Sequence, residues 1–129
     1  MTPKKKPPFS FVIDYLAHKE PVVKPMFGCY AVYIERKIYF ILRKRESHRS
    51  DNGVWIAVSK ADHKELKKLL PSMRSIKVLG NGPTNWQIIP EGAVSFESEV
   101  LKVCEMVLKG DPRIGKIPKP KKKKTPPAR

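Results

Sequence analysis

Two neighbouring apolar runs between residues 29 and 42 constrain the fold most strongly, because only the three charged residues Glu35-Arg36-Lys37 separate them. The alternate positions are apolar in both runs: Tyr30, Val32 and Ile34 in the first, and Ile38, Phe40 and Leu42 in the second. A period of two is typical of β-strands, and so short a connection favours a tight antiparallel turn. The segment therefore predicts a β-hairpin, on which the remaining elements must pack.

Apolar periodicity and turn residues predict the other elements. Ser10, Ser59 and Ser95 precede three helical patterns and are expected to cap them. The expected helices are Phe11–His18, Lys60–Leu70 and Phe96–Lys109, and the further strands are Val54–Val58, Ile76–Leu79 and Trp86–Ile89. The order α-β-β-β-α-β-β-α predicts a single α+β domain whose mainly antiparallel five-stranded sheet is flanked by helices.

The net charge of +15 is concentrated at the two ends of the chain. Residues 1–6 and 113–129 hold eleven Lys and Arg and no acid, whereas residues 7–112 hold 16 basic and 12 acidic residues. Basic, proline-rich segments are typical of disordered chain. We therefore predict a disordered basic segment at 1–8, a folded domain at 9–110 and a disordered Lys/Pro-rich tail at 111–129.

The apolar stretches of the sequence argue against a membrane-spanning helix and against a signal peptide. No stretch approaches the ~20 apolar residues of a membrane-spanning helix. The lysines at the start precede an apolar segment, but it is short, contains Asp14 and lacks a cleavage site for a signal peptidase. These features predict a cytoplasmic protein without a membrane partner. Cys29 and Cys104 are too few for a disulfide scaffold and are expected to be buried free thiols.

The sequence offers no catalytic constellation. Its three histidines and two cysteines show no spacing typical of a zinc site. The turn Gly80-Asn81-Gly82 lacks the Lys-Ser/Thr pair of a phosphate-binding loop. The prediction is a protein without enzymatic activity, cofactor or metal.

Two apolar features allow either a core role or a binding role. Met26 and Phe27 can dock a partner protein or fill the core, and Gly28 after them is explained by a positive φ or a close backbone approach. Trp55 and Trp86 lie on different predicted strands and suit either the core or base stacking.

Two clusters of cations are candidate phosphate contacts. Arg43, Lys44, Arg45 and Arg49 follow the predicted hairpin, where the alternative is a solvated loop. The tail holds Lys119, Lys121, Lys122, Lys123 and Lys124, whose binding to nucleic acid would be nonspecific and salt-dependent. The tail has no aromatic residue, so it does not offer base stacking.

A family resemblance rests on Met26-Phe27-Gly28 before an apolar strand, and on Trp86–Pro90, a strand that ends in proline before the last helix. With these features residues 9–110 resemble the N-terminal domain of the TfoX/Sxy competence regulators. Cys29 and Ala31 stand where that family often has glycine, and its full-length members carry a second domain where this chain has a basic tail. The resemblance implies the same α+β fold and a regulatory role.

Two functional hypotheses follow. The first is a small non-enzymatic regulatory or protein-interaction module with an unknown protein partner, in which a sheet edge or face also allows a homodimer. The alternative is a nucleic-acid-associated protein that contacts phosphates through its tail and the loop at 43–49.

Overall fold

The expected hairpin is present in a computed structural model of the chain, which describes residues 7–78 and 85–117. Strand β2 covers Cys29–Ile34 and strand β3 covers Lys37–Arg43, and they pair antiparallel. Two residues connect them, and the first, Glu35, has a φ of 58°. The alternating pattern therefore predicts both strands and the turn correctly.

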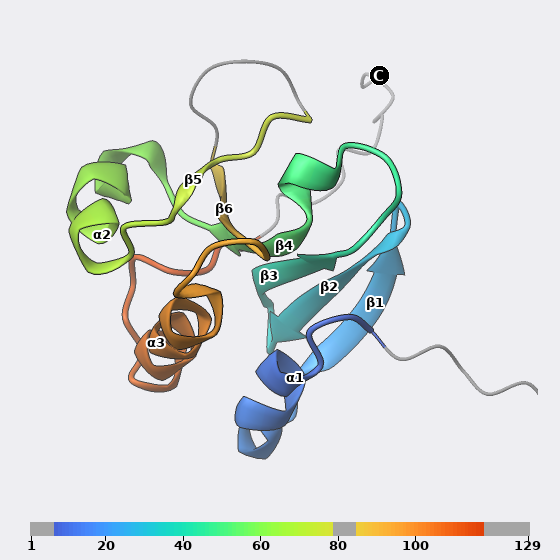
Figure 1. Cartoon of the computed structure of the whole chain (residues 1–129). Coiled ribbons are helices and arrows are strands. Elements are labelled where there is room, and N and C mark those ends of the chain that lie inside the picture. Colours follow the sequence, from blue (N-terminus) through green and yellow to red (C-terminus); the bar gives the residue numbers. More distant parts are fainter. Residues whose placement is uncertain (1–6, 79–84, 118–129) are drawn as a thin grey trace, which may run out of the picture.

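The hairpin belongs to a six-stranded antiparallel sheet with the order β1-β2-β3-β4-β6-β5 (Figure 1). The other strands are β1 (Val22–Met26), β4 (Gly53–Ala57), β5 (Arg74–Ser75) and β6 (Trp86–Pro90). Each neighbouring pair runs antiparallel. The predicted α+β class is confirmed, with six strands in place of five.

Three α-helices contribute to one apolar core against one face of this sheet (Figure 1). They are α1 (Phe11–Tyr15), α2 (His63–Leu69) and α3 (Phe96–Leu108), and 3-10 turns occupy Ala17–Lys19, Arg49–Asp51 and Lys60–Asp62. Val12, Leu66 and Val103 from the three helices join Phe40 and Val54 from the sheet in one buried cluster. This arrangement leaves the opposite face of the sheet without a packed helix among the described residues.

Strand β1 is absent from the sequence prediction. Its sequence, Val-Val-Lys-Pro-Met, lacks a clear alternation, and Pro25 suggests a break between elements. The strand lies at the edge of the sheet, where a proline removes no ladder hydrogen bond and a lysine can face the solvent.

The strand predicted at Ile76–Leu79 is also wrong. The structure instead has the two-residue β5, which pairs with β6 just before that segment. The backbone N–H groups of Lys77 and Val78 do not enter a ladder but donate to the Asp51 carboxylate. Leu79 lies outside the described residues, as does the predicted turn at 80–83.

The helices are shorter than predicted at several ends. Helix α1 ends at Tyr15 and gives way to a 3-10 turn, and α2 begins at His63 after another such turn. Within the described chain, none of Ser10, Ser59 and Ser95 makes a side-chain capping hydrogen bond to the helix backbone. Ser95 donates to the carboxylate of Glu99 instead.

The segment 111–117, predicted as part of a disordered tail, packs on the domain. Ile114 is fully buried in the helix-side core. The Lys116 and Ile38 backbones exchange two hydrogen bonds of 3.0 Å, and the Gly115 N–H donates to the Ala57 carbonyl. The folded domain therefore extends at least to residue 117, and the tail lysines from Lys119 onward lie outside the described residues, as do residues 1–6.

Both cysteines are buried free thiols, as predicted. Cys104 on α3 is fully buried, and its burial raises the pKa of the thiol from 9.0 to about 12. Because the folded state retains this proton more tightly, its stabilising effect is present below pH 9 and is lost as the pH rises toward 12.

We therefore predict that iodoacetamide at about pH 8 leaves Cys104 unmodified in the native protein, because the thiolate is the reacting form. Peptide mass spectrometry after timed alkylation measures this, with the urea-unfolded protein as the control in which both thiols react. Native alkylation of Cys104 at the unfolded-state rate would contradict the prediction.

Candidate functional site

The sheet face opposite the helices carries a second apolar cluster. Its buried members are Cys29, Ala31, Ile38, Ile41, Trp55, Ile76 and Ile88. Met26, Tyr33, Val78 and Trp86 pack against this cluster and remain half-buried. No residue of the described helices belongs to it. Side chains of the sheet, together with Ile76 and Val78, form this surface.

A hollow of about 340 Å³ opens in this face beside the turn between β1 and β2. Its lining residues are Met26, Phe27, Cys29, Ile41, Arg43, Arg45, Trp55, Val78 and Trp86. The two tryptophan rings lie with their centroids 6.2 Å apart at an angle of 52°. The Trp55 indole N–H donates to the Asp51 carbonyl at 2.9 Å, which holds that ring in place.

The turn between β1 and β2 places an aromatic ring in solvent. Met26 pairs with Cys29, so Phe27 and Gly28 form a two-residue loop, with φ angles of 46° and 77°. Positive φ at both positions is the pattern of a type I′ turn, for which Asn-Gly is the favoured sequence. Phe27 is 89% exposed, whereas Met26 packs against the second apolar cluster. The two residues of the pair thus differ in exposure: Met26 is half-buried and Phe27 is exposed, and both line the hollow.

Phe27 is unfavourable in this turn for two reasons. A left-handed backbone costs a residue with a Cβ roughly 1–2 kcal/mol, and an exposed ring gains nothing from burial. Strained backbone of this kind concentrates at functional sites.

Gly28 allows Arg45 to approach the turn. A Cβ at position 28 would lie 2.9 Å from both Nε and Cζ of Arg45. The Arg45 guanidinium also donates to the Phe27 carbonyl at 3.3 Å. Gly28 therefore has the positive φ expected from the sequence, and the group that approaches it closely is the Arg45 side chain and not a backbone.

Arg43 does not present its charge to a ligand. It is 3% exposed and donates to the Ser47 carbonyl at 2.9 Å, the His48 carbonyl at 3.0 Å and the Asn52 side-chain oxygen at 2.7 Å. The predicted phosphate contact by Arg43 is therefore not supported, and the residue instead stabilises the loop at 44–51.

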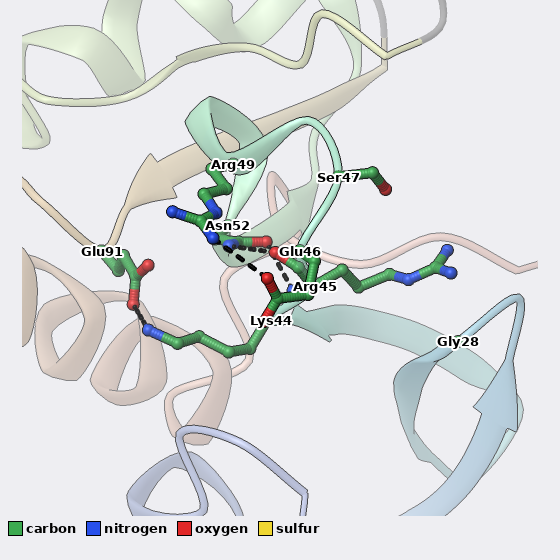
Figure 2. A pocket seen from close by; sticks show the side chains of 8 residues that line it. All are labelled: Gly28, Lys44, Arg45, Glu46, Ser47, Arg49, Asn52 and Glu91. Carbon is green, nitrogen blue, oxygen red and sulfur yellow. Dashed lines mark hydrogen bonds and ion pairs between the residues drawn. The ribbon is translucent and has the colours of Figure 1, made fainter.

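The other cations of this loop lie around an open hollow of about 710 Å³ (Figure 2). Lys44 pairs with Glu91 at 2.6 Å, and Arg49 pairs with Glu46 at 3.0 Å. The Arg45 side chain extends away from these pairs toward the turn at Gly28 (Figure 2). Arg45 lines both this charged hollow and the apolar one.

The role of Asp51 is not indicated by the sequence. Its carboxylate is fully buried and accepts hydrogen bonds from Arg74 at 3.1 Å and from the backbone N–H groups of Lys77 and Val78 at 2.8 and 2.7 Å. These bonds hold the segment that carries Val78 against the apolar hollow. Their partners are more than twenty residues away, so no local pattern indicates them.

Asn52, the next residue, also has a role that the sequence does not indicate. Its side chain accepts from the Arg45 N–H and donates to the Arg45 carbonyl, both at 2.8 Å. It thus supports the backbone of Arg45, the residue that lines both hollows.

The described residues contain no group of three or more His, Cys, Asp or Glu side chains able to hold a metal ion. None of the helices in the described ranges combines the length and apolar content that a bilayer crossing requires.

These features define an α+β domain with helices on one sheet face and an aromatic hollow on the other. Comparisons of the chain with protein-family models, curated proteins and solved structures found no match.

Proposed function

We propose that this chain is a small non-enzymatic protein-interaction module that binds its partner at the apolar hollow beside Phe27. The observation that carries the proposal is the ring of Phe27, which is 89% exposed on a positive-φ backbone. Such a residue costs stability in the free protein, and contact with a partner gives it a function.

The composition of the hollow supports the same proposal. Tryptophan, methionine and arginine are enriched at the centres of protein interfaces, and all three line it. The turn that carries Phe27 is also part of the resemblance to the TfoX/Sxy regulators. On that basis we propose a regulatory role in the cytoplasm, exerted through a bound protein.

The substitution Phe27→Asn tests the site without disrupting the turn. Because asparagine tolerates a left-handed backbone, we expect the variant to gain about 1 kcal/mol in the free energy of unfolding, measured in urea. In affinity capture after nuclease treatment, we expect the wild type to retain a bound protein that this variant does not retain.

The matched control is Val94→Asn, which removes another fully exposed apolar side chain. This variant should retain the same protein as wild type. Equal retention by Phe27→Asn, or retention that depends on intact nucleic acid, would contradict the proposed function.

Nucleic-acid binding through the tail is a second candidate, favoured by the five lysines between 119 and 124. Removal of residues 118–129 should weaken binding to double-stranded DNA at low salt and reduce its salt dependence, as measured by fluorescence anisotropy. The deletion must start after residue 117, because loss of Ile114 would also remove core packing. Unchanged affinity would count against the tail, and no binding even at low salt would reject this candidate.

A further inference from the structure

We infer that the hollow takes an apolar side chain flanked by carboxylates, so that the partner is a protein with a short acidic-apolar segment. This inference rests on the proposed function and specifies its ligand. It depends on the apolar walls of the hollow, the single available charge at its rim and the neutralised charges beyond it.

The walls suit one apolar side chain. Trp86, Met26 and Val78 border the hollow and are half-buried, so each still has surface to lose on binding. A volume of about 340 Å³ admits one large side chain but not a folded element. Methionine adapts its shape to an incoming group, which favours a site of this kind.

The rim offers a positive charge without an acidic partner. The two charged residues that line the hollow are Arg43 and Arg45, and Arg43 is committed to its loop. Arg45 takes part in none of the ion pairs formed by the described residues. Its guanidinium donates a hydrogen bond to the Phe27 carbonyl at 3.3 Å. A guanidinium of this kind suits a carboxylate, to which it can donate two parallel hydrogen bonds.

The neighbouring charges favour a peptide over a nucleic acid. Lys44 and Arg49 already pair with Glu91 and Glu46, so these two cations offer less positive charge to a phosphate backbone that extends from Arg45. Trp55 is only 8% exposed, so it offers little ring face for a stacked base. The chain's own residues 118–129 hold six Lys and Arg and no acid, which is the wrong charge to bind beside Arg45.

The chain provides its own reporter for the test, because its two tryptophans both line the hollow. The probes are blocked peptides Glu-Glu-Gly-Phe-Gly-Glu-Glu and Lys-Lys-Gly-Phe-Gly-Lys-Lys, titrated into the full chain while tryptophan emission is recorded. We expect a saturable change with the acidic peptide and at least about tenfold weaker binding of the basic one.

Two variants locate the charge effect. Arg45→Gln should weaken binding of the acidic peptide by about tenfold, which is the contribution of one charge-assisted contact. Arg36→Gln removes an exposed arginine from the turn between β2 and β3 and should leave the affinity unchanged. Emission of each variant without peptide, compared with wild type, shows whether the hollow is intact.

The outcomes separate the two proposals. Equal affinity for both peptides, or no effect of Arg45→Gln, would overturn the acidic-ligand inference and leave the docking site standing. No saturable change up to about 1 mM of either peptide, or a change that Phe27→Asn does not reduce, would overturn both. Tighter binding of an oligothymidylate that displaces the acidic peptide would assign the hollow to nucleic acid. A change that depends on protein concentration alone would assign it to a second copy of the chain, and either result overturns the inference.

Discussion

Replacing Asp51 by alanine is expected to lower the free energy of unfolding by about 3 kcal/mol, the lower end of the range for breaking a buried ion pair. The lower end applies because Arg74 remains 27% exposed and water can solvate its charge after the substitution. The loss also includes two backbone N–H groups, of Lys77 and Val78, that would lose their acceptor. Urea unfolding followed by tryptophan emission measures the change.

The control for this prediction is Glu46→Ala, which removes a carboxylate that is 95% exposed and paired only at the surface. Its effect should stay within about 0.5 kcal/mol. Asp51→Asn removes the charge but keeps one acceptor oxygen, and it should fall between wild type and alanine. A loss below about 1 kcal/mol for Asp51→Ala would show that the buried carboxylate contributes little.

The substitution should also affect the hollow, because Asp51 binds the segment that carries Val78. Loosening that wall would change the emission of Trp86, which packs on the same cluster. A variant that is destabilised but keeps native tryptophan emission would show that the segment has other sufficient contacts.

Local periodicity explains which parts of the fold the sequence predicts. Helix α3 buries one regular face, and the hairpin at 29–42 packs on both faces of the sheet, so both elements appear in the sequence as apolar patterns. Strand β1 has no such pattern, because an edge strand exchanges hydrogen bonds on one side only and its side chains are largely exposed. The strand expected at Ile76–Leu79 is wrong because a distant carboxylate takes the N–H groups that a ladder would have used.

The same distinction applies to the candidate site. The sequence indicates Met26-Phe27-Gly28 as a candidate site but does not predict which side chain is exposed. In the structure a tight turn with two positive φ angles leaves Met26 half-buried and Phe27 exposed. The loop at 43–49 appears in sequence as four equivalent cations. In the structure Arg43 is buried and bound to its own loop, and Lys44 and Arg49 are paired with acids. Arg45 is the exposed one of the two arginines that line the apolar hollow. Composition gives the total charge, while the fold determines which charge a ligand can reach.

Gly53→Ala is expected to have the largest effect of all the substitutions considered, a loss of about 4 kcal/mol in the free energy of unfolding, from backbone strain and overpacking together. Gly53 begins β4, where it pairs with both Arg43 on β3 and Pro90 on β6. Its φ is 152°, and an added Cβ would lie 2.9 Å from the Glu91 nitrogen and nearer still to the Ile89 carbonyl oxygen. Both are backbone atoms, one of β6 and one of the residue after it, so they cannot rotate away as a side chain could.

The matched control is Gly92→Ala, two residues after β6, where an added Cβ meets nothing within 4 Å. That variant should stay within about 0.5 kcal/mol of wild type. If Gly53→Ala does not fold, the comparison of soluble yield and thermal midpoint with Gly92→Ala still tests the prediction. An equally small effect at both positions would mean that β4 and β6 can separate without cost. Such free separation would contradict the pairing of Trp55 with Ile88, which are both buried in the second apolar cluster.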